Sequence, residues 1–318
     1  MKKVITFGEA MTMFVATEAG SLEDRQTFNK YLAGAETNVA IGLSRLGFDV
    51  GFSSRVGQDS LGRFISSTLA KENIDISHIS LDPNYPTGFQ LKSNVGAGDP
   101  VVEYFRGFSA FRQLRKEDIN QGWVKQADHL HLTGIPIALS ETVREYTDEM
   151  IELAHKYGIT ISFDPNLRPV LWSNESTMTA RVNQIAFQAD WMFPGITEGQ
   201  QLTGYENPRD IASFYLDKGV KLVVIKLGEK GAYYRTNDAE GTVEGYFVEQ
   251  VIDTVGAGDG FAVGTISGLL ENLTVPQAVA RGNAVGALAI QSQGDSDGLP
   301  TRQQLNKFIH SHIKQGVK

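Results

Sequence analysis

The sequence contains no cysteine. Disulfide bonds and thiolate metal sites are therefore excluded, and any metal ion must be held by oxygen or nitrogen ligands. No apolar run approaches the length of a membrane span, and residues 1–9 enter a strand pattern instead of the hydrophobic region of a signal peptide. We therefore expect a cytoplasmic protein whose partners do not include a membrane.

The chain also has few basic residues for its size. It carries 29 lysines and arginines against 37 aspartates and glutamates, which gives a net charge of −8, and it has no lysine and arginine run. This balance argues against nucleic acid as a partner, so an anionic ligand would have to meet a few locally placed positive groups. The length of 318 residues and the hydrophobic content of 41% suit one large α/β domain, with or without a small second one.

Over most of the chain, short β-branched segments alternate with amphipathic helical segments. The helical pattern at 141–157, for example, ends at Gly158, a residue type that commonly closes helices. Strands separated by such helices favour a parallel sheet with right-handed crossovers. We expect strands at 4–7, 50–56, 129–132, 159–163, 191–193 and 221–226, and a hairpin or edge pair at 231–235 and 242–248.

This alternation stops between about Pro86 and Phe111. Two extended runs, 88–93 and 101–106, are joined there by a glycine turn, and together with strand-like segments near 12–32 they predict a small sheet that could act as a lid. The open edges of such a sheet favour a homodimer, or a higher homo-oligomer, formed through the lids. The predicted domains are a core of residues 1–11, 34–86 and 112–318 and a lid of residues 12–33 and 87–111.

Residues 253–264 carry the clearest chemical signal. They read Asp-Thr-Val-Gly-Ala-Gly-Asp-Gly-Phe-Ala-Val-Gly, a glycine turn followed by an apolar helical segment that continues to about Leu270. Gly256 and Gly258 allow the backbone to approach a ligand closely, and the helix directs unpaired N–H groups to the same point. Asp259 would place a carboxylate beside the bound anion. This arrangement is typical of a phosphoryl-transfer site.

The tetrapeptide Gly-Ala-Gly-Asp proves little by itself. It also occurs at 96–99, where Pro100 and a strand-like run follow and no helix begins, so that copy is interpreted as a hairpin turn. Taken alone, the second copy would most simply be a helix N-terminus with a glycine turn and an acid that suits the helix dipole. Only the sequence context of the second copy favours an anion site.

Polar residues follow several of the predicted strands. Glu9 follows the first strand, Asp164-Pro-Asn-Leu-Arg168 follows another, Lys226 and Gly228 follow a third, and Asp253 follows a fourth. The carboxyl ends of parallel strands lie along one edge of an open sheet, where ligands bind. We therefore expect these side chains to converge on one site.

Two motifs resemble the signatures of the ribokinase-like, or PfkB, carbohydrate kinase family. Residues 33–40, Ala-Gly-Ala-Glu-Thr-Asn-Val-Ala, followed by Gly47 and Gly57, are similar to its N-terminal signature, and residues 253–260 are similar to its C-terminal signature. The resemblance covers roughly the whole chain. Within the family, the sequence looks most like the 2-keto-3-deoxygluconate kinases, on the segments 34–38, 104–106, 164–172 and 225–231.

The resemblance implies a Rossmann-like (ribokinase-like) three-layer α/β/α core with a mostly parallel sheet, plus a small β-sheet lid. It implies an ATP-dependent kinase that phosphorylates the terminal hydroxyl of 2-keto-3-deoxy-D-gluconate to give the 6-phosphate. Mg²⁺ would come with the nucleotide, held mostly by phosphates and water. Glu198 is a candidate ligand for Mg²⁺, and Asp253 is a candidate ligand for a monovalent cation.

The same resemblance implies the roles of the catalytic residues. Asp259 would be the base, although its ordinary pKa of about 3.9 would make it a weak one, so that orienting the hydroxyl would matter as much as removing its proton. Backbone amides of Gly256, Ala257 and Gly258 would hold the developing phosphate charge. Lys226, Gly228 and Gly231 would bind the nucleotide together with Gly256 and Gly258, with Asn283 as a further candidate.

On the substrate side, Gly34 and Asn38 would bind sugar hydroxyls, although Asn38 could instead cap a helix. Arg168 would recognise the carboxylate of a sugar acid, because its planar guanidinium suits that group. As single residues, Arg168 and Lys226 are also compatible with plain surface positions. Four other candidates complete the predicted substrate site, namely Gln90, Tyr104 and Arg106 from the lid and Asp259 from the core.

Three positions depart from the family pattern. Glu36 replaces a small residue or proline of the broad signature, which fits the ketodeoxygluconate branch. Position 195 is glycine, so the Asn-x-x-Glu magnesium motif ending at Glu198 is incomplete, and Gln90 stands where tyrosine is expected. The choice between a sugar acid and a neutral sugar, as in fructokinases and ribokinases, therefore stays open.

Two other classes of protein are alternatives. A dinucleotide-dependent dehydrogenase could contain Gly256-x-Gly258 between a strand and a helix, but position 261 is phenylalanine where its fingerprint needs glycine. A catalytically silent sugar- or nucleotide-binding regulator could share the same fold. The presence of Asp259 beside an intact glycine turn counts against that regulator.

Overall fold

The strands of the core alternate their apolar side chains between two faces of one large sheet. In the computed structural model, which describes residues 1–94 and 100–313, Val223 and Ile225 pack in one apolar cluster while Leu222 and Val224 pack in another. Because successive strand residues point to opposite faces, a strand that is apolar throughout must be covered on both sides. Two helical layers provide that cover.

The large sheet has nine strands in the order β13-β12-β11-β10-β9-β8-β1-β4-β5. The strands from β5 to β11 in this order are parallel, whereas β12 and β13 are antiparallel. Their bounds are β1 Lys3–Phe7, β4 Asp49–Gly57, β5 Asp75–Asp82, β8 His129–Thr133, β9 Thr160–Asp164, β10 Trp191–Met192, β11 Leu222–Lys226, β12 Ala232–Arg235 and β13 Glu240–Val243.

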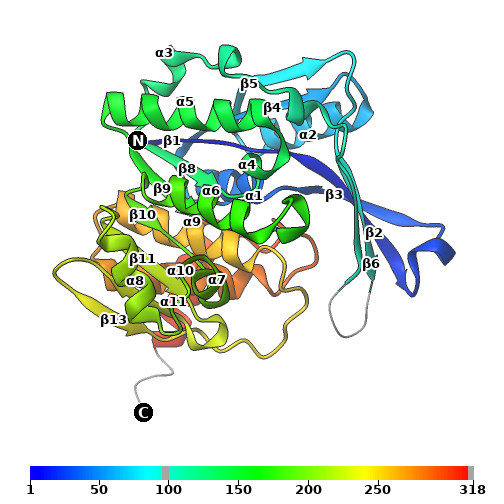
Figure 1. Ribbon diagram of the computed structural model, residues 1–318. Coiled ribbons are helices and arrows are strands. Elements are labelled where there is room, and N and C mark those ends of the chain that lie inside the picture. The colour runs from blue at the N-terminus through cyan, green and yellow to red at the C-terminus, as the bar shows by residue number, and fades with distance from the viewer. Residues whose placement is uncertain (95–99, 314–318) are drawn as a thin grey trace.

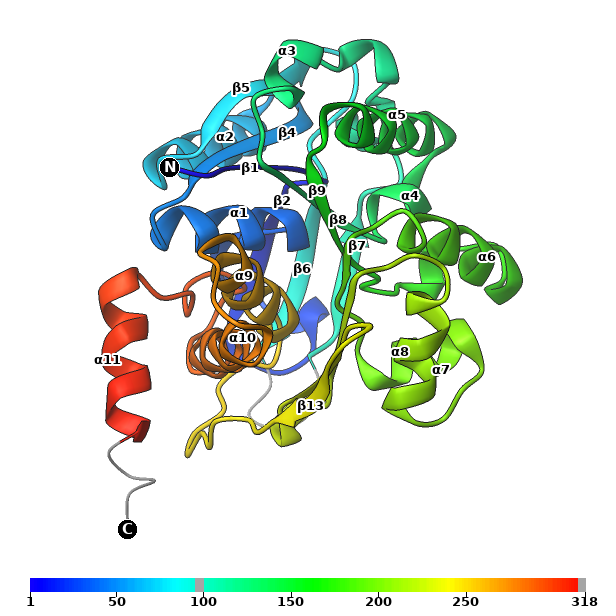
Figure 2. The ribbon, with the colours of Figure 1, turned by 90° about the vertical axis from the view of Figure 1, so that its left-hand side faces the viewer.

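Helices cover both faces of this sheet, as Figure 2 shows. On one side lie α1 Ala35–Arg45, α2 Ser60–Lys71, α9 Ala257–Leu270, α10 Val275–Ala289 and α11 Arg302–Ile313. On the other side lie α3 Gln121–Val124, α4 Pro136–Leu139, α5 Glu141–Tyr157, α6 Glu175–Ala186, α7 Ile196–Thr203 and α8 Pro208–Leu216. The predicted three-layer α/β/α fold with a mostly parallel sheet is confirmed.

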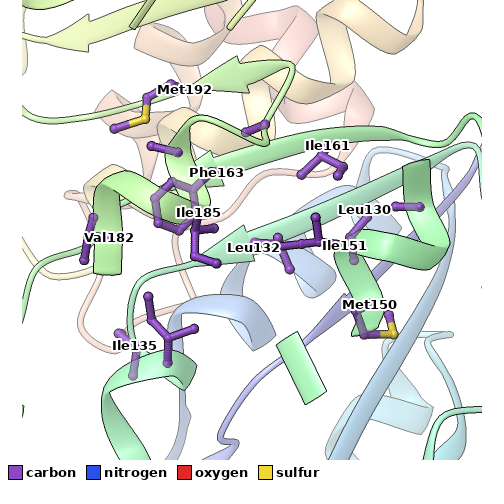
Figure 3. Packing of buried hydrophobic residues seen from close by; sticks show 14 of the residues in the cluster. Leu130, Leu132, Ile135, Met150, Ile151, Ile161, Phe163, Val182, Ile185 and Met192 are labelled. Carbon is purple, nitrogen blue, oxygen red and sulfur yellow. The ribbon is translucent and has the colours of Figure 1, made fainter. Parts of the chain in front are cut away.

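Local sequence explains where several helices begin and end. The Ser140 hydroxyl accepts a hydrogen bond from the Val143 amide at the start of α5, and Gly158 closes that helix with a φ of 69°. The inner face of α5 then packs against β8 and β9, where Met150 and Ile151 meet Leu130 and Ile161 (Figure 3). This core holds β9 rigidly, and so fixes the position of Asp164 at its end.

A second, four-stranded sheet stands beside the core (Figure 1). Its order is β3-β2-β6-β7, with β2 Met11–Ala19, β3 Phe28–Ala33, β6 Phe89–Asn94 and β7 Val102–Phe105. We call it the small sheet. The strands predicted at 88–93 and 101–106 are confirmed, and the turn predicted at 96–99 lies outside the described residues. That the small sheet acts as a lid stays a prediction.

One part of the predicted strand pattern is wrong. The run 242–248 ends its strand at Val243, and no strand lies between Val243 and Gly256, so Asp253 does not follow a strand. Where the chain leaves the sheet, the Asn283 side chain of α10 binds the carbonyl oxygens of Val243 and Glu244. Among the helices within the described residues, none is long and apolar enough to cross a bilayer.

Candidate active site

Two cavities meet at the carboxyl ends of β1, β9 and β11, beside the first turn of α9. The first cavity has a volume of about 380 Å³ and the second about 830 Å³. Glu198, Lys226, Thr254 and Gly258 line both of them. A ligand in one cavity can therefore reach a ligand in the other across the α9 N-terminus.

The first cavity contains every residue predicted for the substrate: Gly34, Asn38, Gln90, Tyr104, Arg106, Arg168 and Asp259. The second cavity contains most of those predicted for the nucleotide: Lys226, Gly228, Gly231, Gly258 and Asn283. Gly256 lines the first cavity and Ala257 the second, whereas Asp253 lines neither. The predicted substrate and nucleotide sites thus fall into two adjoining spaces.

The turn before α9 has the geometry of an anion site. Gly256 is the N-cap residue, with a φ of 82°, and a Cβ atom added there would lie 2.4 Å from the Asp295 carbonyl oxygen. Only glycine fits such a position. Gly258 and Asp259 lie in the first turn, where helix geometry provides no partner for the amides, while the Ala257 amide donates a long bond of 3.4 Å to the Thr254 carbonyl.

Asp259 is buried at the wall of the first cavity, next to Gly258, which lines both cavities. Its Oδ2 accepts a hydrogen bond of 2.8 Å from Asn38 Nδ2, and its Oδ1 lies 3.5 Å from Asn166 Nδ2. Burial raises the pKa of this carboxyl to about 7, against the opposing hydrogen bond from Asn38. The expectation that Asp259 is a weak base is therefore corrected, because its raised pKa makes the carboxylate a stronger base than an ordinary aspartate.

Asn38 does not cap α1, because Gly34 occupies the N-cap position. Its side chain is turned to Asp259, and its Oδ1 is buried without a hydrogen-bond partner among the described residues. A buried amide oxygen without a partner is costly, and it faces a cavity large enough for a ligand. A ligand hydroxyl is a suitable donor for it.

Lys226 is held by charge and is not a solvated strand end. Its Nζ donates a bond of 2.6 Å to Asp164 Oδ2, and the side chain is 18% exposed. Burial alone would lower the lysine pKa, but the carboxylates of Asp164 and Glu198 raise it overall. A permanent positive charge therefore faces both cavities at their junction.

The two arginines predicted to read the substrate differ in their partners. Arg106 is buried, and it pairs with Glu9 at 2.5 Å, while Ser109 Oγ donates to the other Glu9 oxygen. Arg168 is exposed to the cavity, and among the described residues its guanidinium bonds only the carbonyl oxygen of neighbouring Leu167. Arg168 thus has no ion-pair partner among the described residues, although its charge acts on the Asp295 carboxylate, whereas the charge of Arg106 is already offset by Glu9.

The small sheet supplies the remaining wall of the first cavity. Gln90 on β6 and Tyr104 on β7 are paired across the two strands, and the Arg106 guanidinium lies 5.7 Å from the centre of the Tyr104 ring. Tyr104 and Arg106 therefore contact each other, as their spacing predicts. Lys92, two residues after Gln90, also lines this wall. It was missed in the sequence, although the same alternation points to it.

Glu36 lies on the floor of the first cavity. It is buried, and the Thr133 hydroxyl donates a hydrogen bond to its Oε1. Burial raises the Glu36 pKa to about 7. Near neutral pH the Glu36 carboxyl can therefore donate a hydrogen bond as well as accept one. Gly8 leaves room for the Glu36 side chain, because a Cβ atom on residue 8 would lie 2.2 Å from Glu36.

In the second cavity, Gly228 and Gly231 both have positive φ angles, 64° and 90°. Asn283 donates from Nδ2 to the carbonyl oxygens of Val243 and Glu244, at 3.1 and 2.9 Å. It therefore holds the chain where it leaves β13, and this fixes the wall of the cavity. Its role toward a nucleotide stays a prediction.

Two acids were predicted as metal ligands. Glu198 caps α7, with its two oxygens accepting bonds from the Gly195 and Leu167 amides at 2.7 and 2.8 Å, and it still lines both cavities. Asp253 pairs with Lys92 at 2.5 Å. Within residues 1–94 and 100–313, no group of three or more histidine, aspartate and glutamate side chains is placed to hold a metal ion.

Known proteins share both the sequence and this architecture. The chain is 51% identical over 318 residues to 2-dehydro-3-deoxygluconokinase of Bacillus subtilis (strain 168), covering 98% of each chain. A protein of Escherichia coli described as ribokinase II, solved with ATP and Mg²⁺, is 27% identical with a TM-score of 0.91, over 98% of this chain and 100% of that one.

A double-mutant fructokinase of Vibrio cholerae O395, solved with fructose, ADP and a potassium ion, is 30% identical. Its TM-score is 0.85, over 97% of this chain and 98% of that one. The model of the pfkB family of carbohydrate kinases matches residues 1–302. The dehydrogenase alternative is thereby excluded. This chain belongs to the PfkB family of carbohydrate kinases.

Proposed function

We propose that this carbohydrate kinase is an ATP-dependent 2-keto-3-deoxy-D-gluconate kinase. The terminal hydroxyl would attack the γ-phosphorus of ATP, the bond to the bridging oxygen would break, and the products would be the sugar 6-phosphate, ADP and a proton. The observation that carries the proposal is the buried Asp259 in the first cavity, next to Gly258 at the junction with the second, together with Arg168, whose guanidinium has no ion-pair partner among the described residues. The identity with the Bacillus subtilis enzyme supports the choice of substrate.

Asp259 would accept the proton of the attacking hydroxyl. With a pKa of about 7, a large share of the carboxyl is ionised at neutral pH and remains basic enough to assist proton transfer. Asn38, which donates to one carboxylate oxygen, holds the group in one orientation. The partnerless Asn38 Oδ1 would accept a bond from the sugar.

The first turn of α9 and Lys226 would stabilise the transferring phosphoryl group. The amides of Gly258 and Asp259 are positioned before the reaction, so they need no reorganisation as charge develops on the phosphoryl oxygens. The Lys226 ammonium, oriented by Asp164, lies at the same junction. The adenosine and the leaving phosphates would occupy the second cavity.

Mg²⁺ would accompany the nucleotide, where it neutralises phosphate charge. The described residues offer no closed set of carboxylates, which suits an ion bound mainly by phosphate oxygens and water. Glu198 would be its protein contact, directly or through water, because the carboxylate lines both cavities and keeps lone pairs beyond its two backbone bonds.

The carboxylate of the substrate would bind Arg168. Arg106 is the weaker candidate for that role because Glu9 already balances its charge, so we assign Arg106 to hydroxyl recognition, together with Tyr104 and Gln90. A neutral sugar would leave the Arg168 guanidinium without an anion. This difference favours a sugar acid over fructose or ribose.

Two further parts of the proposal concern the whole protein. We expect a cytoplasmic enzyme, where ATP is available. We also expect a homodimer formed through the small sheet, because Phe105 of β7 is 46% exposed and Val101 and Phe108, just outside β7, are 59% and 81% exposed. Exposed apolar side chains next to open strand edges favour association with a second copy.

An ADP-release assay over a panel of sugars tests the assignment. We expect turnover with 2-keto-3-deoxygluconate at a kcat/KM well above that for fructose, ribose or gluconate. A preference for ribose or fructose would reject the sugar acid as substrate and leave a kinase of neutral sugars. No turnover with any sugar would favour a catalytically silent binding protein.

A further inference from the structure

A lysine of the small sheet reaches into the core beside the anion site. Lys92 on β6 is 4% exposed, and its Nζ lies 2.5 Å from Asp253 Oδ2. The other oxygen of Asp253 accepts a bond of 3.0 Å from the Val255 amide. Asp253 therefore joins two elements: the small sheet, through Lys92, and the turn that ends in Gly256, through its own backbone.

The surroundings of this turn explain why a positive charge is needed. Asp295, 7% exposed, has a carboxylate oxygen without a hydrogen-bond partner among the described residues, and its backbone carbonyl packs on Gly256. Asp253 and Asp295 thus place two acidic groups next to a site that must accept phosphate. Burial raises the Asp295 pKa to about 6, and the positive charge of Lys92 opposes that shift. Without a cation, both acids would repel the incoming phosphoryl group.

The family resemblance predicts a monovalent cation near Asp253, and the related fructokinase was solved with a potassium ion. The residues of this chain do not favour such an ion at the Asp253 carboxylate. The Lys92 ammonium, 2.5 Å from Oδ2, already balances its charge and would repel a second cation at the same oxygens. We therefore interpret Asp253 as the ion-pair partner of Lys92.

We propose that Lys92 supplies an internal cation: its ammonium replaces a free monovalent cation at Asp253, so that the turn before α9 is ordered without potassium. The Lys92 ammonium belongs to β6, which also carries Gln90 on the same side. The Lys92–Asp253 ion pair therefore connects the wall of the first cavity to the turn before α9. Lys92 is a positioning residue in this proposal, because it acts on phosphate through the turn.

The proposal builds on the kinase activity proposed above, and its first test needs no substitution. The rate of ADP formation with 2-keto-3-deoxygluconate is measured directly by chromatography, in potassium, sodium or tetramethylammonium chloride at equal ionic strength. Direct detection avoids coupling enzymes that respond to potassium themselves. We expect kcat to change less than about twofold between the salts. Stimulation of the wild-type enzyme by potassium, severalfold over tetramethylammonium, would overturn the proposal.

The second test uses Lys92→Ala, which leaves space beside Asp253. In tetramethylammonium chloride we expect kcat to fall at least about tenfold, since the phosphate-binding amides lose their fixed position. Potassium or ammonium ions should restore a large part of the loss, because either can enter the space left by the side chain. Loss of activity that no small cation restores would show a merely structural lysine and would also reject the proposal.

ADP affinity, measured by calorimetry in the same salts, gives a readout that is independent of the sugar. For Lys92→Ala we expect ADP binding to weaken and to recover with potassium, while wild-type binding is insensitive to it. Failure of turnover with every sugar, with this binding pattern intact, would reject the proposed substrate and retain the internal cation.

Two controls separate a local effect from misfolding. Lys92→Arg keeps the charge, and it should retain independence from potassium. Lys30→Ala removes another lysine of the small sheet, which is exposed and lies over the Phe64 ring at 4.0 Å, outside the two cavities. It should leave the salt response unchanged. A potassium requirement in Lys30→Ala equal to that in Lys92→Ala would show that any loss of lysine loosens the sheet, which contradicts a specific role for Lys92.

Discussion

Asp259 shows how a single side chain acquires its chemistry from the fold. An aspartate in water is a poor base for an alcohol, but burial beside the first cavity raises the pKa of this one to about 7. The nearby Asp164 carboxylate adds to the shift, while Asn38 and Lys226 limit it. The result is a carboxyl that changes charge in the pH range where the enzyme would work.

Replacing Asp259 by asparagine should remove the base and keep the shape of the site. We expect kcat to fall by about 10²- to 10⁴-fold, the usual contribution of general acid–base catalysis. ADP binding should be largely retained, since the amides of the α9 N-terminus remain. Activity within about threefold of the wild type would contradict the assigned role.

The same assignment gives a pH dependence with a definite sign. The protonated carboxyl cannot accept a proton, so kcat/KM of the wild-type enzyme should rise with pH, through a midpoint near 7, and level off above it. The residual activity of Asp259→Asn should lack this rise. A flat wild-type profile between pH 5.5 and 8.5, a range of about 1.5 units either side of that midpoint, would argue against Asp259 as base.

A substitution of the single residue Arg168 tests whether the substrate is a sugar acid or a neutral sugar. Loss of a charged hydrogen bond to a carboxylate costs about 1.5–3 kcal/mol, so Arg168→Ala should lower kcat/KM for the sugar acid about 10- to 100-fold. For a slowly used neutral sugar the change should be small. Equal losses for both would show that Arg168 does not read the carboxylate. The matched variant Arg168→Lys, which keeps charge without the planar fork, should lie between the two.

At the scale of elements, the N-terminus of α9 depends on one backbone angle. Gly256→Ala introduces a Cβ in a left-handed conformation, 2.4 Å from the Asp295 carbonyl oxygen. We expect a loss of about 1–2 kcal/mol of unfolding free energy from the conformation alone, more from the collision, and a fall of about 10²-fold in kcat as the amides shift. Urea unfolding and steady-state kinetics measure the two effects.

Gly158→Ala is a matched control for this variant. Gly158 also has a left-handed φ, of 69°, but a Cβ there meets nothing within 4 Å. It should cost about 1 kcal/mol of stability and leave kcat unchanged. If both variants lost activity equally, reduced stability would explain the result for Gly256, and the special role of its position would be rejected.

Elements with strong local signals could be predicted from the sequence. The segments of α5 and α9 follow from local sequence: α5 from its apolar spacing and the glycine that closes it, and α9 from the glycine turn and the apolar run after it. The run 242–248 predicts a strand, because its β-branched residues suit one, but the strand stops at Val243, where Asn283 binds the carbonyl oxygens of Val243 and Glu244. Local sequence sets only the preference of a segment for helix or strand. Contacts with residues distant in the chain decide which structure forms.

The candidate site was predictable only in part, for the same reason. Gly256, Asp259 and Asn38 stand in motifs that chemistry and resemblance identify. The partner of a charged residue cannot be found in this way: Lys92 and Asp253 are 161 residues apart, and Arg106 and Glu9 are 97 apart. Such pairs show which arginine has an ion-pair partner and which acid already has a cation beside it. Only the folded chain brings them together.

At the scale of the whole molecule, the small sheet has an outer surface that a monomer leaves exposed. Phe108→Asp places a charge three residues beyond β7, at an aromatic residue that is 81% exposed, and should shift the protein from dimer to monomer. Light scattering coupled to gel filtration gives the mass directly. Phe247→Asp is a matched control, because Phe247 is 83% exposed but lines the second cavity. A wild-type protein that is monomeric at micromolar concentration would reject the proposed dimer.

The site also lowers the stability of the whole protein in a pH-dependent way. Because the pKa of Asp259 is raised to about 7, the folded state holds a proton that the unfolded chain has lost between pH 4 and 7. Stability from this group is therefore full below about pH 4 and falls as pH rises to 7. Asp259→Asn carries no such penalty, so its advantage in unfolding free energy should be about 2–3 kcal/mol larger at pH 8 than at pH 5.

Urea unfolding of the ligand-free proteins at the two pH values measures this difference. Glu36 and Asp295 also have raised pKa values, but both proteins contain them, so most of their effect cancels. Asp217→Asn, at an exposed position, should show no comparable change between pH 5 and 8. Equal pH slopes for wild type and Asp259→Asn would show that Asp259 is already ionised at pH 5. Burial would then not have made it the stronger base on which the proposed mechanism depends.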